Sequence, residues 1–461
     1  MHETLTVARY AAGVQFDALP ASVVDCAKRL ILDQLACQIG VSQKAWLRPA
    51  VSYVDSVGGK PESTIISSPN RSSAENAAFV NGSFGHGFEI DDAYPPGLLH
   101  PGAVIVPAAL AVAERDGCSG RDLLRAIVLG YDVMGRVGKS LSPTQLTRGF
   151  HPTSAAGPIG AAVAVGSLMG LTCEQMTHAI AISASSCGGL TECYKSGGEI
   201  KRYHAGIAAS AGVRAAGLAR LGLTGPSTIL EGPLGIRAMT DTFTPEALTE
   251  GLGEWFLVER VWIKKYCCNG MLHAPLDALE AIVARRRVVR KQIKGIVVGS
   301  NRQAPHEVGS SQAPKDIFRL QFSMGYTLAM RIVFGDVGLQ RFSEATLRHA
   351  ELAALARRVT VGVDPVVDGY YPSKIGGRVT IHFADGTSDD ETIEDCRGTP
   401  NNPMSPEEMR VKVHAVAGLA MEVSNVDRLI ELVDQLDSLP DVQPLSALLT
   451  LSNWTGARGK H

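Results

Sequence analysis

Apolar side chains recur at helical spacing through most of the first half of the chain. In residues 22–39 they fall three or four positions apart from Val23 onward, and Gly40 follows as a helix-stop signal. Thr172 and Gln175 have the spacing of a capping box. Strand-like patterns are missing before about residue 290. Similar helical patterns predict helices at residues 73–88, 103–114, 120–138, 153–169, 172–186 and 202–221.

The pattern changes in the middle of the chain, where short β-branched runs replace the helical spacing. These runs predict strands at residues 292–298, 358–363 and 378–383. Asp385-Gly386 follows the third run as a hairpin signal, because glycine adopts the backbone conformations that tight hairpin turns need. A helix is predicted at residues 322–334, and another near Ser343.

Helical spacing returns toward the C-terminus. Ser405, Pro406 and Glu408 form a helix start, with a capping serine, proline at the first position and a glutamate that completes the capping box. The sequence therefore predicts a mainly α protein. A large all-helical domain of residues 1–270 plus 405–461 carries a smaller inserted α+β domain of residues 271–404.

Length and charge narrow the classes of protein and partner. The 461 residues exceed one ordinary domain, and a formal net charge of -2 argues against nucleic acid and membrane surfaces as partners. The uncharged stretch at residues 152–173 is rich in small residues, so it predicts a buried helix rather than a membrane span. No apolar leader segment is evident at the start, which favours the cytoplasm.

Cysteine usage points to reduced thiols and away from metal clusters. The nine cysteines are odd in number, and none form a Cys-x-x-Cys pair. We therefore expect no disulfide framework and no metal site. Cys267 and Cys268 are adjacent, but no order of histidine and aspartate supports a nucleophile, so we expect them to serve in packing.

The first candidate site is an acidic segment that follows a predicted helix. Glu89, Asp91 and Asp92 lie within four residues, between His86 and His100. Their mutual repulsion requires cations, amide groups or shared protons, which is typical of a site that tunes pKa values. A solvated acidic turn explains the acidity equally well, but the two histidines favour function.

Two further clusters place cationic or titratable side chains at helix starts. His151 precedes Pro152, where a helix dipole would favour the neutral imidazole, although a loop carbonyl would also satisfy this histidine. Lys201 and Arg202 follow a glycine-rich turn, and His204 shares a helix face with the lysine. Taken alone, this second cluster is better explained as a basic surface cap.

A fourth cluster combines two lysines, a phenol and an imidazole. Lys264, Lys265 and Tyr266 precede Asn269 and His273 at another predicted helix start. Lysines in such a place offer charge-assisted hydrogen bonds to a carboxylate. This cluster indicates a functional site only in combination with the other three clusters.

The order and spacing of these clusters resemble the MmgE/PrpD family. The matching segments are NG…H…EIDD…HPG in residues 81–102, RGFHPTS in 148–154, KRYHAG in 201–206 and KKY…H…DAL in 264–279. Later landmarks are QFS in residues 321–323, DG in 385–386, and GTP and PMS in 398–405. The resemblance implies a large helical domain, a smaller lid-like α+β domain, a homodimer, and neither metal nor organic cofactor.

The resemblance also assigns roles to residues of the four clusters. It implies catalytic roles for Asp91, His100, His151, Lys201 and Lys264. It implies substrate-binding roles for Glu89, Asp92, Arg202, His204, Lys265, Tyr266, Asn269 and His273. The partner that these residues imply is a small di- or tricarboxylate. A histidine would take its α-proton, and either His151 or His100 fits that role.

The family's activities include dehydration of 2-methylcitrate, decarboxylation of cis-aconitate and epimerisation of iminodisuccinate. The family's decarboxylase looks to have an aspartate where this chain has Glu89, and an active-site histidine where this chain has Asn269. Both differences count against decarboxylation by this protein. We expect a lyase, and specifically a hydro-lyase similar to 2-methylcitrate dehydratase. Epimerisation, then decarboxylation, then a non-catalytic carboxylate binder are the alternatives.

Overall fold

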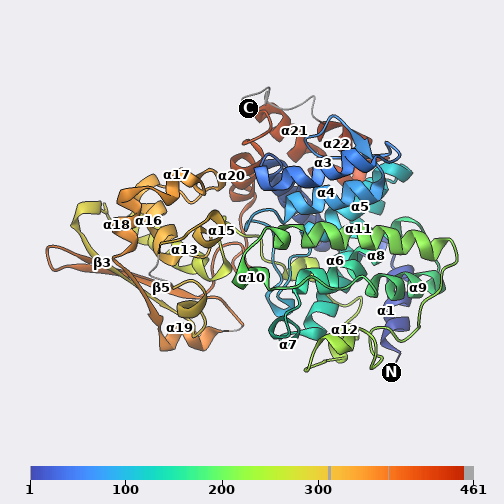
Figure 1. Ribbon diagram of the computed structural model, residues 1–461, viewed down its shortest axis with the longest axis horizontal. Helices are drawn as coiled ribbons and strands as arrows, with labels where there is room; N and C mark the ends of the chain where they lie inside the picture. The colour runs from blue at the N-terminus through green and yellow to red at the C-terminus, as the bar shows by residue number, and fades with distance from the viewer. Residues whose placement is uncertain (1, 310–312, 372, 451–461) are drawn as a thin grey trace. The chain divides into compact units, whose positions relative to one another are not determined.

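The computed structural model describes residues 2–309, 313–371 and 373–450 and is mainly helical, which confirms the predicted fold class (Figure 1). The chain divides into two compact units. Unit 1 comprises residues 1–262 and 406–461, and unit 2 comprises residues 263–405. Unit 1 is therefore discontinuous in sequence, and the C-terminal helices return to it after unit 2.

Unit 1 is a bundle of helices with one minimal hairpin. Its helices are α1 (Glu3–Gly13), α2 (Ala21–Val41), α3 (Arg48–Val57), α4 (Ala74–Gly85), α5 (Gly102–Asp116), α6 (Gly120–Leu141), α7 (Thr144–Thr147), α8 (Pro152–Leu168), α9 (Cys173–Ala184), α10 (Cys193–Ser196), α11 (Ile200–Arg220), α12 (Glu246–Thr249), α20 (Pro406–Ala417), α21 (Val423–Asp434) and α22 (Gln443–Leu448). Strands β1 (Ser63–Thr64) and β2 (Arg71–Ser72) pair antiparallel.

The short β1–β2 pair corrects the expectation that no strand precedes about residue 290. Two residues per strand leave no room for the alternation that sequence patterns detect. The predicted helices of this half are present with ends shifted by a few residues, and the capping box of Thr172 and Gln175 is formed at α9.

Small residues set the close packing at the centre of unit 1. Helix α8 packs against α6 and α11, and α11 packs against α4. A Cβ atom on Gly82 would lie 2.8 Å from the Cα atom of Gly206, and one on Gly212 would lie 2.3 Å from Ala161. Backbones approach this closely only where side chains are absent or minimal. The uncharged stretch predicted as a buried helix is α8, and its described side chains are buried almost throughout.

Unit 2 is built on a four-stranded sheet with the order β4-β3-β5-β6. β3 pairs parallel with β4 and antiparallel with β5, and β5 pairs antiparallel with β6. Helix α13 packs on β5 and β6, and α16 contacts β4 (Figure 1). The strands are β3 (Ile293–Ser300), β4 (Val359–Val363), β5 (Gly377–Phe383) and β6 (Ser388–Ile393), and the helices are α13 (His273–Arg285), α14 (Ala304–Glu307), α15 (Ile317–Leu320), α16 (Met324–Phe334), α17 (Glu344–Leu347), α18 (Ala350–Ala356) and α19 (Pro365–Tyr370).

The three predicted strands and the hairpin are present in unit 2. The turn between β5 and β6 contains Gly386 at φ 87°, in the left-handed region that glycine adopts without strain. The hairpin also adds the β6 strand, which begins at Ser388 and whose polar sequence gave no strand signal. An edge strand with alternating half-buried positions tolerates such polarity.

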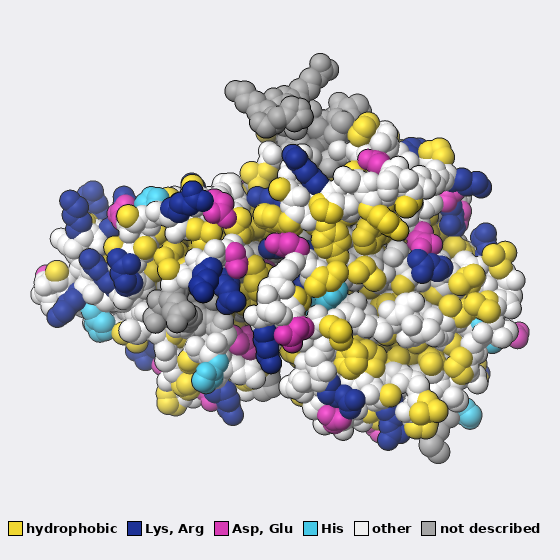
Figure 2. All heavy atoms as spheres, viewed as in Figure 1, with side chains coloured by type: hydrophobic (Ala, Val, Ile, Leu, Met, Phe, Trp, Pro, Cys, Tyr) yellow, Lys and Arg dark blue, Asp and Glu magenta, His cyan; other side chains and the backbone are white. Residues whose placement is uncertain are grey.

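The surface of unit 1 mixes apolar and charged side chains. Ile200, Ile207 and Leu218 of α11 are exposed, as is Leu221 directly after it. Figure 2 shows apolar side chains interspersed with charges on the face toward the viewer. No helix among the described residues has the length and apolar character needed to cross a membrane.

The contact between α11 and α4 makes a stability prediction at two glycines of one helix. A Cβ on Gly206 would lie 2.1 Å from the carbonyl oxygen of Phe79, whereas one on Gly217 would meet nothing within 4 Å. We expect Gly206→Ala to lower the free energy of unfolding by about 1–3 kcal/mol through overpacking. Gly217→Ala should raise it by up to about 1 kcal/mol through helix propensity. Chemical denaturation measures both, and equal effects would contradict the close-packing explanation.

Candidate active site

The candidate site in unit 1 is centred on residues 86–101, which connect α4 to α5. His86 follows the last residue of α4, and Pro101 precedes the first residue of α5. The carboxylates of this connection are buried: Glu89 is 6% exposed, Asp91 0% and Asp92 1%. Burial of three carboxylates is costly unless each has a partner. The alternative of a solvated acidic turn, which the sequence left open, is therefore excluded.

Asp91 lies between two histidines. Its Oδ2 atom is 2.6 Å from Nδ1 of His86 and 3.5 Å from Nδ1 of His100. Nδ1 of His100 is also 2.7 Å from the carbonyl oxygen of Asp92. A carbonyl only accepts, so Nδ1 of His100 carries a proton. The neutral His100 ring therefore has its lone pair on Nε2, and the Asp91 carboxylate complements a positive charge on it.

Asp92 is a buried carboxyl group whose pKa lies near neutrality. Its oxygens accept hydrogen bonds from the backbone N–H of Gly102 at 2.9 Å and the hydroxyl of Tyr131 at 2.7 Å. Burial and the charge of Asp91 raise the pKa of Asp92 to about 7, although both hydrogen bonds lower it. Asp92 thus anchors the start of α5.

His151 is one of the two inner members of a series of four neighbouring imidazoles. Its ring centroid is 5.4 Å from that of His86 and 5.1 Å from that of His204, and His86 lies 5.0 Å from His100. His151 precedes α8 directly, so it lies at the positive end of that helix. Burial, followed by the positive charges of neighbouring groups including Lys201, lowers the pKa of His151 well below its ordinary value. At neutral pH this ring is uncharged and accepts a proton.

Lys201, in the first turn of α11, contacts the segment of residues 86–101 that carries the buried carboxylates. Its ammonium group forms a buried ion pair with the carboxylate of Glu89. Arg202, its neighbour, has its guanidinium bonded to the Gly87 carbonyl oxygen at 2.6 Å and stacked on Trp46 at 4.6 Å. The structure therefore brings the lysine into the charge cluster, whereas it uses the arginine to fix the backbone beside it.

A second buried ion pair contacts the backbone of the same connection. Lys412 of α20 lies 2.5 Å from a carboxylate oxygen of Asp33 in α2 and donates to the carbonyl oxygen of Ile90 at 3.3 Å. Sequence reasoning missed both residues. The available signal was their place among apolar side chains: Lys412 is three residues after Met409 and one before Val413, and both of these are buried. A charge at such a position predicts a buried partner.

The five remaining predicted residues belong to unit 2. Lys265 lies 2.7 Å from Glu280 and 3.1 Å from Asp277, and the Tyr266 hydroxyl donates to Asp277 at 2.7 Å. Oδ1 of Asn269 accepts from the backbone N–H of the residue two positions later, as a helix cap does. Buried His273 stacks edge-on with Tyr266 at 5.2 Å, and Lys264 is also buried. Their predicted roles remain predictions.

Three residues of the cluster have the donor set of a metal site. Candidate ligand atoms of His86, Asp91 and His100 lie within 4.8 Å of one another. The Nδ1 atoms of both histidines hydrogen-bond to Asp91 or to the carbonyl of Asp92. A metal bound at these atoms would displace the protons of those bonds. The geometry thus describes a hydrogen-bonded acid–base cluster whose donor types also suit a divalent ion.

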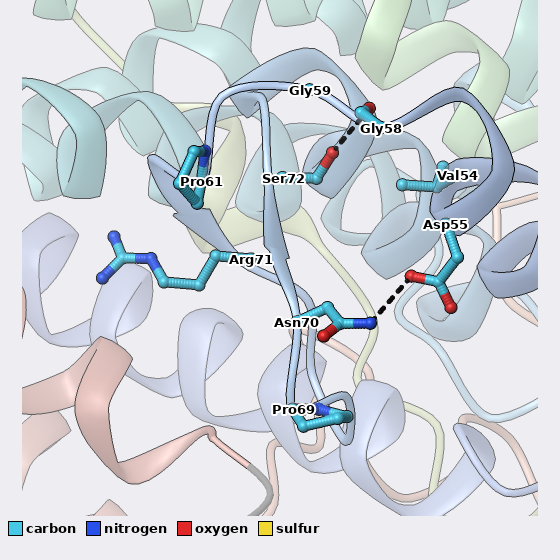
Figure 3. Close-up of a pocket in the computed structure, with 9 residues that line it drawn as sticks. All are labelled: Val54, Asp55, Gly58, Gly59, Pro61, Pro69, Asn70, Arg71 and Ser72. Atoms are coloured by element: carbon cyan, nitrogen blue, oxygen red, sulfur yellow. Dashed lines mark hydrogen bonds between the residues drawn. The ribbon is translucent and has the colours of Figure 1, made fainter.

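A separate open pocket of about 400 Å³ lies between α3 and the β1–β2 hairpin (Figure 3). None of the predicted site residues lines it. Its polar side chains already have partners: the Asn70 amide donates to Asp55 at 3.1 Å, and Arg71 pairs at 2.8 Å with Glu114, which lies outside the lining. These groups do not converge on a ligand, so this pocket is a weaker candidate than the histidine cluster.

A helical bundle with buried imidazoles, carboxylates and a lysine defines a class of proteins suited to acid–base chemistry on a small anion. The chain matches the MmgE/PrpD N-terminal domain over residues 6–247 and the MmgE/PrpD C-terminal domain over residues 266–438. The protein belongs to the MmgE/PrpD family, which confirms the resemblance seen in the sequence.

Relatives of known name resemble the chain over nearly its whole length. The cis-aconitate decarboxylase of Aspergillus terreus is 29% identical, and the alignment covers 97% of this chain and 95% of the relative. A cis-aconitate decarboxylase-like protein of Aspergillus oryzae is 27% identical over 94% of both chains. The human cis-aconitate decarboxylase is 26% identical over 95% of this chain and 92% of its own length.

The raised pKa of Asp92 makes a prediction for stability against pH. Asp92 has a pKa of about 7 in the folded protein, against an ordinary 3.8. The folded state therefore binds this proton more tightly, and the stabilisation is complete below about pH 4 and lost as the pH rises to about 7. Relative to Asp92→Asn, the wild type should lose about 1.4 kcal/mol per pH unit across this window. Unfolding titrations at several pH values measure the difference; a flat or rising difference would contradict the raised pKa.

Proposed function

We propose that the protein is a lyase that acts on a small tricarboxylate through proton transfer by its own side chains. The observation that carries the proposal is the burial of His151 among three other imidazoles at the start of α8, where burial and nearby positive charges, including that of Lys201, lower its pKa. A base of this kind removes a proton alpha to a carboxylate, and a nearby cation stabilises the negative charge that develops. The relatives named as cis-aconitate decarboxylases support the tricarboxylate class of substrate.

Lys201 and the helix starts supply the positive charge that such a substrate needs. Lys201 lies in the first turn of α11, and His151 immediately precedes α8. Helix N-termini favour anions, and a lysine adds charge-assisted hydrogen bonds. The carboxylate of Glu89 occupies this lysine in the structure, so substrate binding would exchange or share that ion pair.

Dehydration is the reaction that this arrangement supports best. In this step, a ring nitrogen of His151 takes the α-proton, a carbon–carbon double bond forms, and the carbon–oxygen bond breaks. His100 delivers a proton to the departing hydroxyl, which leaves as water. The Asp91 carboxylate, 3.5 Å from the His100 ring, stabilises the protonated ring before transfer. The favoured substrate is a hydroxy tricarboxylate similar to 2-methylcitrate.

Decarboxylation is the second candidate, because the relatives from Aspergillus terreus and human are named cis-aconitate decarboxylases. Loss of carbon dioxide from cis-aconitate needs a proton delivered to carbon, which is the task of an acid. The residue that resembles an active-site histidine in the decarboxylase is Asn269 here, and its side chain caps a helical turn. An amide does not supply a proton at neutral pH, so dehydration remains the preferred reaction.

Proton exchange in deuterated water tests the proposal. The protein would be incubated with 2-methylcitrate, citrate, cis-aconitate and iminodisuccinate, and NMR would follow products and deuterium incorporation. Loss of water from 2-methylcitrate supports the hydro-lyase, and itaconate from cis-aconitate would replace it with the decarboxylase. Exchange without elimination would favour an epimerase. Absence of turnover and exchange with all four compounds would refute the lyase.

Variants of two residues test the assigned base and cation. His151→Gln should slow turnover by at least about 100-fold, because general-base catalysis contributes that much or more. Lys201→Met should raise KM and lower kcat, since both binding and charge stabilisation are lost. Matched controls are His382→Gln and Lys294→Met, whose side chains are exposed in unit 2. Wild-type rates in both site variants would show that the base and the cation lie elsewhere.

The lowered pKa of His151 also predicts the pH dependence of the reaction. An ordinary histidine base loses activity as the pH falls through 6.5, because its ring becomes protonated. His151 stays neutral to a lower pH, so kcat/KM should hold its value from pH 7 to pH 6 and fall only below that. A pH profile of kcat/KM measures this limb. A half-maximal point at 6.5 would show that an unperturbed histidine is the base.

A further inference from the structure

His151 and His204 face each other through the same ring nitrogen. Their Nδ1 atoms are 3.0 Å apart, which is hydrogen-bond distance, and both side chains are 3% exposed. His204 lies in α11, while the backbone N–H of His151 donates to the carbonyl oxygen of Gly189 at 2.8 Å. A Cβ on Gly189 would lie 3.3 Å from Nδ1 of His204, so this loop packs against the pair. The contact is therefore fixed from both sides.

Two neutral imidazoles in this arrangement share one proton between their Nδ1 atoms. Burial and the charge of Lys201 lower the pKa of His204 to about 4, and the pKa of His151 is also lowered. Two protonated nitrogens at 3.0 Å would repel, and two lone pairs would leave buried acceptors facing each other. One ring must donate from Nδ1 and the other must accept, so each ring's tautomer determines the other's.

We infer that His204 is a positioning residue that accepts the Nδ1 proton of His151 and thereby keeps the lone pair of His151 on Nε2. The inference rests on the proposed function, in which His151 takes the substrate's proton. Among the described residues, the bond to His204 is the hydrogen bond that the His151 ring makes. Nε2 is then the nitrogen left for substrate. In the reverse arrangement Nε2 carries a proton, and neither nitrogen can act as a base.

His204 is a neutral hydrogen-bond partner for His151, and its neutrality has a chemical consequence. In the same cluster, the carboxylate of Asp91 is bonded to His86, and a carboxylate favours the charged form of a histidine. His204 orients His151 without adding a negative charge, so His151 remains neutral until it meets the substrate's proton. Once His151 is protonated, its bond to the His204 lone pair becomes charge-assisted and stabilises the new cation.

Two substitutions of His204 separate tautomer control from packing. His204→Asn keeps an oxygen acceptor at nearly the position of Nδ1, whereas His204→Leu fills space without an acceptor. We expect the leucine variant to lose about 10- to 100-fold in kcat with KM changed by less than about 3-fold. The asparagine variant should retain kcat within about 5-fold of the wild type. Thermal unfolding of both variants controls for stability.

NMR of protein labelled with ¹⁵N-histidine reads the tautomer without any substrate. Long-range proton–nitrogen spectra distinguish protonated from unprotonated ring nitrogens, and the His151 signals are assigned by their absence in His151→Gln. In wild type and His204→Asn, His151 should be protonated on Nδ1 and unprotonated on Nε2. In His204→Leu this tautomer should lose its dominance.

The outcomes separate this inference from the proposed function. A His151 ring protonated on Nε2 in the wild-type protein would overturn the inference, even if the enzyme turns over 2-methylcitrate. An unchanged tautomer and kcat in His204→Leu would also overturn it. The expected tautomer in a protein that lacks all lyase activity would uphold the tautomer pairing and remove only its catalytic use.

Discussion

The rest of the site depends on one constraint, which is that the carboxylates in the connection from α4 to α5 are buried away from water. Glu89, Asp91 and Asp92 are all buried within a helical bundle, where an isolated carboxylate would be prohibitively costly. Each has a different form of compensation. Glu89 pairs with a lysine, Asp91 with histidines, and Asp92 keeps a proton at a pKa near neutrality.

These compensating groups come from helices that are distant in sequence. Lys201 comes from the start of α11 and Tyr131 from α6. Lys412 of α20, which follows unit 2 in the chain, pairs with Asp33 and binds the backbone of the same connection at Ile90. The glycine contacts between α4 and α11 allow the helix start that carries Lys201 to approach the acidic connection. Packing and electrostatics are therefore coupled: small residues permit the approach, and charge pairing makes the burial tolerable.

The same burial shifts the pKa values on which the proposed chemistry depends. Desolvation that raises the pKa of Asp92 lowers that of His151, because it disfavours the negative form of one group and the positive form of the other. Below about pH 7 the cluster therefore holds a protonated Asp92 carboxyl group and a neutral His151 ring together. In the proposed reaction His151 is the base, His100 is the acid, and Asp92 fixes the start of α5 beside them.

The sequence predicted the mainly α fold and the family because both depend on local patterns. Helical spacing identified the long helices, and ordered motifs identified the residues that surround His151. The ring-to-ring contact with His204 and the support from Lys412 were beyond reach, because both depend on tertiary contacts. The bond between the Arg202 guanidinium and the Gly87 carbonyl oxygen is a further tertiary contact of this kind, and the substrate-binding role predicted for Arg202 stays a prediction.

Two strands show why short or polar strands are harder to predict from sequence than long helices. The strands were recognisable from β-branched runs, but the polar strand that begins at Ser388 depends on its neighbour β5 for its identity. Unit 1 also contains a hairpin of two-residue strands, whose pairing of Ser63 with Ser72 no alternation could reveal. In both cases the structure is decided by partners rather than by local sequence.

The most direct test of the account is the titration of the His151 ring itself. NMR of ¹⁵N-histidine, recorded from pH 8 downward and assigned with His151→Gln, reports the charge of this one side chain in the substrate-free protein. We expect His151 to be neutral still at pH 6 and to take up its proton well below the ordinary pKa of 6.5. A ring that is half-protonated at pH 6.5 or above would contradict it, because burial in the charge cluster would then have no effect on the proposed base.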